Sequence, residues 1–348
     1  MKDLDTREWL LTNGLGSFAS GTVSDARTRS YHGWLIAALD PPSGRTLLLS
    51  HLETTLEVSG QVWALGTNFW SDGTIAPLGY QYLRSFAIDP VPTWVWSGDN
   101  WQLTRQMVMP SGLVNNLPFC NRILVNYRYE GQETGILRLR PLIGDRDFHH
   151  QHSASPELTF SQLVGQRQVF LQAIGKDWVG TPWYLRWTQG EYQPEGVWYW
   201  NYYYPEENKR GLGDREDLYN PGYITVIVQP GDILTIEARV GWPDPDAIGL
   251  SSDEFVEALQ AEEQRNLGEL PVGSSQIYRQ LLQAGDRFIV YRASIDGPTV
   301  IAGYPWFNDW GRDTLIALPG LALTTKRFDL AKGLLQTFGR YCKSGLIP

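Results

Sequence analysis

Hydrophobic and polar residues alternate with a period of two along much of the chain from Arg45 to Trp242. The alternation is clearest over residues 101–109, 123–129 and 234–240. Such a pattern is typical of a β-strand with one buried face. Glycine and proline separate the alternating stretches, at Gly131, Gly190, Pro221-Gly222 and Pro230-Gly231. No helical periodicity intervenes, so the pattern predicts a large antiparallel β-sandwich, a supersandwich, rather than a parallel sheet.

The period changes to that of a helix near residue 250. Residues 251–254 resemble a helix start, and the polar segment after them predicts a helix that ends near Gly268. Ser274 or Ser275 is placed to cap a second helix, whose apolar stripe comprises Ile277, Leu281, Leu282, Ala284 and Phe288. Two more helices are expected over residues 312–323 and 328–341, with a turn between them at 324–326. The fold class is therefore mainly β with α.

Charge and composition narrow the possible partners. The formal net charge is −9 and the pI is near 5.1. Nucleic-acid binding needs clustered Lys and Arg, which the chain lacks, and no apolar run reaches the roughly 18 residues of a membrane helix. The N-terminus has no signal-peptide pattern, and Cys120 and Cys342 form neither a disulfide framework nor a metal motif. We expect a cytoplasmic protein without a cofactor, a metal, a nucleic acid or a membrane partner.

The chain is rich in aromatic residues, with 15 Trp and 17 Tyr. Rings that carry a polar group are enriched where one face stays in contact with water. Taken together they favour a sugar-binding surface, because flat rings match the C–H faces of pyranose units. Packing inside the sandwich explains any single ring equally well.

The segment 303–314 concentrates aromatic and charged side chains just before a predicted helix. Asp309 and Asp313 are four residues apart, so either Asp309 caps the helix or Asp313 lies in its first turn, where the helix dipole favours a carboxylate. A capped helix with an internal Asp–Arg pair explains the charges. It leaves three neighbouring aromatic residues unexplained, namely Trp306, Phe307 and Trp310.

Two other motifs indicate structure rather than chemistry. Residues 13–18 are glycine-rich, but they lack the preceding strand and the spacing of a dinucleotide-binding loop, so they predict turns. His149, His150 and His152 lie in a polar stretch of the chain. A transition-metal site usually needs a third ligand that the fold positions, so we expect solvated histidines rather than a metal site.

Three stretches resemble glycogen debranching enzymes of the bacterial and archaeal amylo-α-1,6-glucosidase type. Residues 306–321, with the run Trp310-Gly311-Arg312-Asp313, resemble the start of the catalytic domain. Residues 8–22 with 28–33 resemble the opening of the N-terminal domain. The third stretch carries Tyr204, Glu207, Arg210-Gly211 and residues 216–218. Residues 146–149 also resemble a family segment, and for these four residues a role near the interdomain cleft is expected.

The resemblance implies a domain plan and a sugar pocket. Residues 1–245 form a glucan-binding β-sandwich, 246–273 a linker helix, and 274–348 the N-terminal part of an (α/α)6 barrel. Trp310, Arg312 and Asp313 are then expected to contact the terminal glucose, because a carboxylate and a guanidinium make charge-assisted hydrogen bonds to hydroxyl groups.

The segment 199–207 is expected to be a loop that reaches the same pocket, with an exposed edge strand as the alternative. The remaining residues of the expected substrate-binding set are Trp306, Tyr204, Glu207 and Arg210.

The resemblance also implies hydrolysis of α-1,6-linked glucose branch stubs of glycogen with inversion. An inverting enzyme uses an acid and a base whose carboxyl groups lie roughly 6.5–9.5 Å apart. Residues 274–348 offer only a few of the helices of six helical hairpins, so we expect the barrel to be truncated and the acid and base to lie beyond Pro348. Asp313, the strongest carboxylate available, is expected to bind substrate rather than to catalyse. Expected partners are glycogen and branched α-glucan oligosaccharides; the sequence indicates neither an oligomeric state nor a 4-α-glucanotransferase.

Two alternative functions stay open at this point. A non-catalytic carbohydrate-binding module predicts that glucan affinity survives deletion of everything after Trp242. A glucoamylase-like α-glucosidase on the same barrel plan predicts a preference for maltose-type over isomaltose-type substrates. A phosphorylase-like enzyme is disfavoured, because no basic cluster for phosphate is present.

Overall fold

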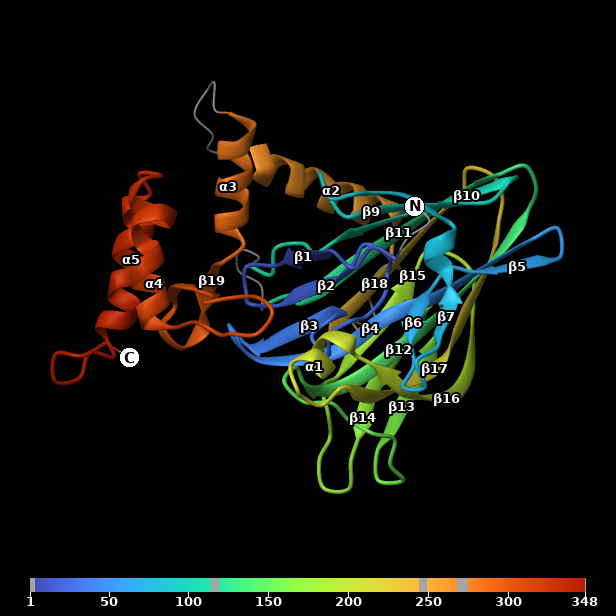
Figure 1. The fold of residues 1–348 in the computed structure, drawn as a ribbon, viewed down its shortest axis with the longest axis horizontal. Helices are drawn as coiled ribbons and strands as arrows, with labels where there is room; N and C mark the ends of the chain where they lie inside the picture. The colour runs from blue at the N-terminus through green and yellow to red at the C-terminus, as the bar shows by residue number, and fades with distance from the viewer. Residues whose placement is uncertain (1–3, 114–118, 244–248, 268–274, 348) are drawn as a thin grey trace.

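The computed structural model describes residues 4–113, 119–243, 249–267 and 275–347. Two eight-stranded antiparallel sheets form a sandwich, and a smaller helical part follows it in the chain and lies to one side (Figure 1). This arrangement confirms the prediction of a large antiparallel β-sandwich followed by a few helices. Within these ranges, no helix has both the length and the apolar character needed to cross a membrane.

The first sheet contains β1 (Glu8–Thr12), β2 (Phe18–Thr22), β3 (Gly33–Asp40), β4 (Ser43–Val58), β5 (Gln61–Ala64), β12 (Gly135–Asp147), β16 (Glu191–Tyr203) and β17 (Arg215–Val228). Its order is β1-β2-β3-β4-β12-β17-β16, with β5 paired to β4. Three strands of this sheet precede Arg45, where the alternation in the sequence first becomes visible. β2 and most of β3 are buried on both faces, and such strands do not alternate in sequence.

The second sheet contains β8 (Leu83–Ala87), β9 (Thr93–Ser97), β10 (Trp101–Val108), β11 (Arg122–Gly131), β13 (Thr159–Gly165), β14 (Gln168–Ile174), β15 (Trp183–Trp187) and β18 (Ile233–Val240). Its order is β13-β14-β15-β18-β11-β10-β9-β8. The three stretches of clearest alternation are β10, β11 and β18, which are hydrogen-bonded neighbours in this sheet. A short separate hairpin pairs β6 (Thr67–Phe69) with β7 (Ile75–Leu78).

The predicted break at Pro221-Gly222 was wrong, because both residues lie inside β17. The pairing of β17 with β12 is irregular at this point: Leu139 pairs with Ile224, and the next pair is Ile143 with Tyr219. A proline is tolerated in a strand where the ladder of hydrogen bonds is interrupted. The other predicted breaks fall at strand ends or between strands, and Gly190 and Gly231 have the positive φ angles that glycine adopts without strain.

The core between the sheets holds many of the tryptophans and one buried ion pair. Trp34, Trp94 and Trp96 surround the guanidinium carbon of Arg105 at 4.2–4.9 Å. Arg105 donates to both carboxylate oxygens of Asp25, over 2.9 and 3.0 Å. Packing inside the sandwich therefore accounts for a substantial part of the aromatic content.

The helices are α1 (Pro205–Lys209), α2 (Ser252–Leu267), α3 (Gln276–Asp286), α4 (Gly311–Leu318) and α5 (Phe328–Gly339), with a π-helical turn at Pro319–Leu323 and 3-10 turns at Gly79–Gln81 and Ala293–Ile295. Ser275 caps α3, because its hydroxyl accepts from the Tyr278 amide; Ser274 lies outside the described residues. The hairpin of β19 (Ile289–Arg292) and β20 (Gly297–Val300) was not predicted, since strands of four residues leave little periodicity.

Helix α2 covers part of the outer face of the second sheet. Phe255 and Ala258 pack against Val108 and Leu124 of that sheet, and Glu254 forms ion pairs with Arg122 and Arg186. The segment after α3 is hydrogen-bonded to the first sheet: the Tyr291 amide donates to the Gly14 carbonyl over 2.8 Å, and the Ala293 amide donates to the Pro41 carbonyl over 2.9 Å. These contacts place the segment 301–314 beside the sandwich.

Candidate functional site

Trp306 lies where the segment between β20 and α4 returns to the sandwich. Its ring packs on the edge of a small aromatic cluster that contains Phe18, Tyr31 and Phe148. The guanidinium carbons of Arg29 and Arg210 lie 5.3 and 5.6 Å from the ring centroid. Cations held over an indole ring at this range attract it electrostatically. The structure thus brings together Trp306 and Arg210, which are far apart in the sequence.

Glu207 sits beneath this contact in the short helix α1. The side chain is only 1% exposed, and one of its oxygens accepts from Arg210 over 3.3 Å. The backbone of Ser30 makes a further hydrogen bond to this carboxyl group. Burial raises the pKa of Glu207, although Arg210 and Arg29 partly offset the rise.

Tyr204 is buried behind Glu207 rather than exposed in a pocket. Its hydroxyl donates to Glu216 over 2.6 Å, and Arg146 donates to the same carboxylate and to the Ser30 carbonyl. Burial, together with Glu216, raises the pKa of Tyr204 well above its ordinary value, so the hydroxyl remains a donor. Residues 199–203 before it form the end of edge strand β16, so the expected free loop was wrong for them. After the end of this strand, Arg210 reaches the Trp306 ring.

Trp310, Arg312 and Asp313 form a second group at the start of α4. Trp310 is the N-cap residue, with an extended backbone, and is 55% exposed. Arg312 and Asp313 pair over 3.2 Å, with side chains 78% and 31% exposed. Asp313 lies in the first turn, where backbone N–H groups and the helix dipole favour a carboxylate. These three side chains are open to solvent and available to a ligand.

Asp309 supports this turn from inside. Its side chain is 3% exposed, forms an ion pair with Arg292 and accepts from the Thr299 hydroxyl over 2.8 Å. Asp309 makes no capping hydrogen bond to α4, because the N-cap residue is Trp310. The alternative in which Asp309 caps the helix was therefore wrong. The exposed turn is instead fastened to the β19–β20 hairpin.

A hollow of about 280 Å³ is lined in part by the two residues that directly precede Trp306 in the chain. Glu8, His32, Tyr304 and Pro305 are among its lining residues. Arg29 donates to Glu8 over 2.6 Å, and the His32 Nε2 atom lies 3.4 Å from the same oxygen. Burial acts to raise the pKa of Glu8, but His32 and Arg29 outweigh it and lower that pKa to about 2.

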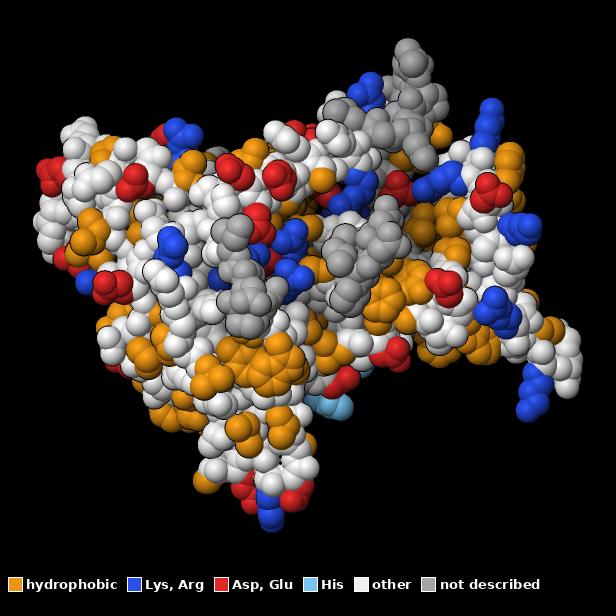
Figure 2. Space-filling view, turned by 180° about the vertical axis from the view of Figure 1, so that it is seen from behind, with side chains coloured by type: hydrophobic (Ala, Val, Ile, Leu, Met, Phe, Trp, Pro, Cys, Tyr) orange, Lys and Arg blue, Asp and Glu red, His pale blue; other side chains and the backbone are white. Residues whose placement is uncertain are grey.

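Arg29 lies in a stretch that resembles the family, but neither Arg29 nor Arg45 was predicted as a member of the site. Arg45 donates to the Phe307 carbonyl over 3.0 Å across 262 positions of the chain, and its guanidinium carbon lies 5.0 Å from the Tyr304 ring centroid. No hydrogen bond or ion pair between described residues joins the Trp306 group to Trp310, Arg312 or Asp313. Figure 2 shows the opposite side of the molecule, where charged side chains of both signs lie between the sandwich and the helical part.

The three histidines are placed separately in the structure. His150 is exposed. The Nδ1 atom of His149 lies 3.1 Å from the Tyr31 hydroxyl oxygen, and the two groups share a hydrogen bond. His152 packs edge-on against Trp198 and is partly buried, so the expectation that all three are solvated was wrong for His152. No group of three metal-ligating side chains forms anywhere in the described ranges.

Comparison with known proteins gives two matching family models. One, described as glycogen debranching enzyme N terminal, matches residues 7–235. The other, described as amylo-alpha-1,6-glucosidase, matches residues 283–348. A glycogen debranching enzyme of Saccharomyces cerevisiae is 46% identical over 56 residues, which are 15% of this chain and 4% of that protein. The aligned region is therefore a small fraction of the yeast relative.

Solved structures give weaker likenesses. A polysaccharide lyase is 10% identical, with a TM-score of 0.30 over 74% of this chain and 34% of the other. A family GH92 alpha-mannosidase from Bacteroides thetaiotaomicron is 11% identical, with a TM-score of 0.32 over 86% of this chain and 38% of the other.

Proposed function

Because the chain belongs to the glycogen debranching enzyme family, we propose that it supplies the glucan-binding part of an amylo-α-1,6-glucosidase. The substrate is glycogen or a branched α-glucan oligosaccharide, and the reaction is hydrolysis of an α-1,6-linked glucose stub with inversion. Both described cysteines are free thiols, which fits a reducing cytoplasm.

The observation that carries the proposal is the exposed group of Trp310, Arg312 and Asp313. An exposed indole ring offers an apolar face to a pyranose ring. The adjacent carboxylate and guanidinium groups form hydrogen bonds with the hydroxyl groups of that sugar. Asp309 holds the turn through Arg292 and Thr299. A site fixed in this way loses little conformational entropy on binding.

The sandwich contributes the other wall of the proposed site. Glu207 is a buried carboxylate of this wall, held by Arg210 and by the backbone of Ser30. Arg210 and Trp306 lie beside it. Tyr204 acts through Glu216, by fixing the segment that carries Glu207.

The carboxylates at residues 275–347 favour binding over catalysis. Asp286 pairs with Arg327, Asp296 accepts from Tyr291, and Asp309 is buried with Arg292. An inverting glycosidase needs two carboxyl groups that face each other across the bond with room for a water. We therefore assign Asp313, at the exposed start of α4, to substrate binding rather than to catalysis.

The test is titration of the chain with isomaltose by calorimetry. We expect Trp310→Ala and Asp313→Asn each to weaken binding about 10- to 100-fold, since a charge-assisted bond contributes about 1.5–3 kcal/mol. Trp242→Ala is the matched control, because Trp242 is 65% exposed but stacks on Phe170 of β14. Equal losses in all three variants would contradict the site.

A second assay tests the catalytic assignment. We expect no glucose release from phosphorylase limit dextrin by this chain alone. Release by this chain would make Asp313 and Asp309 the acid and base. Isomaltose binding that survives deletion of every residue after Trp242 would instead favour a carbohydrate-binding module.

A further inference from the structure

Backbone hydrogen bonds close the segment between β20 and α4 into a loop, the 302–308 loop. At its base, the Ala302 amide donates to the Asn308 carbonyl over 2.9 Å. Directly after the base come Asp309, which is buried and paired, and Trp310. Because the base is closed, the place at which the tip of the loop meets the sandwich also sets the position of the Trp310 ring.

The tip of this loop is held by aromatic rings and arginines of the sandwich. The ring centroids of Tyr304 and Phe18 lie 5.5 Å apart in an edge-on arrangement. Arg29 and Arg210 lie over the Trp306 ring, and each of the two also forms an ion pair with a glutamate side chain. The charges of these two guanidinium groups are therefore compensated without the loop.

Arg45 of β4 contacts the loop in a different way, because none of the described carboxylates forms an ion pair with it. The side chain is only 1% exposed, and its guanidinium carbon lies 5.0–5.6 Å from the ring centroids of Tyr304, Phe148 and Phe18. Its Nη1 atom donates to the Phe307 carbonyl over 3.0 Å. The Nε and Nη2 atoms have no hydrogen-bond partner among the described residues.

A buried guanidinium group without an ion-pair partner costs free energy. The three rings offset part of this cost, because cation–π contacts are stronger away from water, and the Asp309 carboxylate stabilises the charge from farther away. An apolar side chain of similar length would fill the same space without the cost. What the arginine adds is a charged donor for the Phe307 carbonyl, which holds the loop at one defined point.

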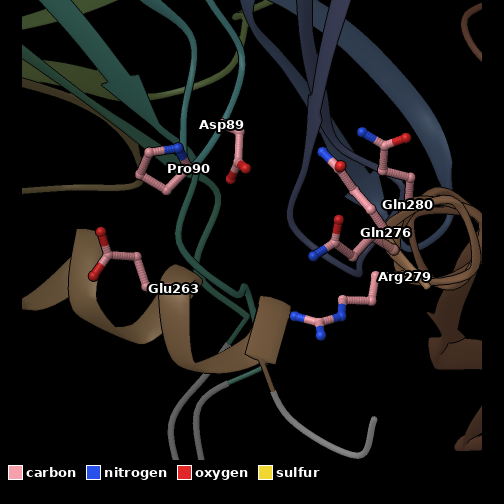
Figure 3. Close-up of a pocket in the computed structure, with 7 residues that line it drawn as sticks. Asp89, Pro90, Glu263, Gln276, Arg279 and Gln280 are labelled. Carbon is pink, nitrogen blue, oxygen red and sulfur yellow. The ribbon is translucent and has the colours of Figure 1, made fainter. Parts of the chain in front are cut away.

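The helical part is held less closely at α3. A hollow of about 510 Å³ lies between Asp89-Pro90 of the sandwich, α2 and α3, and Gln280 is among the α3 residues that line it (Figure 3). No residue of α3 is buried. This helix therefore gives the helical part little hold on the sandwich, which leaves more of the positioning to the 302–308 loop.

We propose that Arg45 is a positioning residue for the sugar site: its buried guanidinium group holds the 302–308 loop on β4 and thereby sets where the Trp310 ring lies. The inference rests on the proposed function, because it takes Trp310 as a sugar contact. It makes the β-sandwich part of the binding geometry through a side chain that does not itself touch the sugar.

The first test compares three variants of the full chain by calorimetric titration with isomaltose. Arg45→Met keeps the apolar volume but removes the donor, and the isomaltose affinity is expected to fall about tenfold. Arg45→Lys keeps a charge and a donor, and its affinity is expected to stay within about threefold of the wild type. Arg140→Met is the matched control and is expected to bind like the wild type, because Arg140 of β12 lies 5.0 Å from the ring of Tyr223 in the same sheet.

Amide hydrogen exchange tests the hold on the loop without any sugar. In Arg45→Met, exchange at residues 302–308 is expected to become faster, while exchange in β10 and β11 stays as in the wild type. Unchanged exchange in the loop, or faster exchange throughout the chain, overturns the proposal. Tyr304→Leu removes a ring on which Arg45 packs and is expected to have the same effects on affinity and exchange, so it replaces Arg45→Met if that variant does not fold.

The outcomes separate this inference from the proposed function. Isomaltose binding that is weakened in Trp310→Ala but unchanged in Arg45→Met refutes the positioning role alone. The same holds if Arg45→Lys binds as weakly as Arg45→Met, or if Arg140→Met loses as much affinity as Arg45→Met. Failure of the wild-type chain to bind isomaltose refutes the proposed function itself.

Discussion

The sandwich and the helical part bury their apolar residues to very different extents. Many leucines and tryptophans that lie between the two sheets are only 0–3% exposed, whereas in the helical part Ile316 is 75%, Ile277 71% and Phe328 63% exposed. Figure 2 shows hydrophobic side chains exposed on the surface of the helical part. A sheet completes its core against a second sheet of the same domain, but a helix stripe stays open until another helix covers it. The same kind of periodicity in sequence therefore leads to a closed core in one region and an open face in the other.

The largest effect is expected from breaking the closed interior of the sandwich. Asp25→Ala leaves the Arg105 guanidinium buried among three tryptophans without its carboxylate. Removing one partner of a buried pair costs about 3–5 kcal/mol, measured as the free energy of unfolding in urea. Glu57→Ala is the control, because Glu57 and Arg138 pair over 3.0 Å with side chains 28% and 31% exposed, and such pairs contribute about 0–1 kcal/mol. Similar losses in both variants would contradict the contrast between interior and surface.

The next effect separates the closed and open sides of the helical part itself. Leu334 is fully buried in a cluster with Val300, Leu318 and Ala331, so Leu334→Ala is expected to cost about 2–4 kcal/mol. Ile316→Ala, at an exposed position, is expected to change stability by less than about 0.5 kcal/mol. Dye binding by exposed apolar surface is expected to fall only in Ile316→Ala. A large loss of stability in Ile316→Ala would show that this face is covered in solution.

The smallest effect concerns pH. Asp145 of β12 accepts a hydrogen bond from the Thr181 amide over 2.6 Å. Burial raises the pKa of Asp145 from 3.8 to about 6, although the hydrogen bonds from Thr181 act to lower it. Because the folded pKa is the higher one, the protonated carboxyl favours the fold. This contribution to stability is present below about pH 4 and is lost as the pH rises from 4 to 6. The loss lowers the free energy of unfolding by about 2 kcal/mol.

The check is urea unfolding at pH 4 and pH 6. The wild-type chain is expected to lose more stability than Asp145→Asn over this interval, because the asparagine does not titrate. An equal pH dependence of the two proteins rules out the carboxyl as its source.

The sequence revealed those strands whose outer face meets water or polar groups. In β10, Thr104 and Gln106 alternate with buried Leu103 and Met107, so the period of two is visible. β2 gave no such signal, because all five of its residues are buried. The helices of the C-terminal part were predicted from their stripes, but whether a stripe is covered depends on neighbours that periodicity does not specify.

Members of the candidate site could be named from the sequence, but which of them meet could not. Trp310, Arg312 and Asp313 fall within four positions, so the aromatic and charged pattern was visible. Arg210 meets Trp306, and Arg45 meets Phe307, only through folding of the chain, and no local pattern marks these contacts. The position of Tyr204 was found, but its burial against Glu216 depends on a cross-strand partner twelve residues away.

The hydrogen bonds between the N-terminal strands and turns and the segment from the end of α3 onward also indicate which contacts form late during translation. The Arg287 guanidinium donates to the Leu10 carbonyl across 277 positions, and translation at about 5–20 residues per second takes roughly 15 seconds to a minute to cover them. β1, β2 and β3 pair with their immediate neighbours, so their edge forms early. The Arg287 contact therefore forms only after the strands of both sheets have been synthesised.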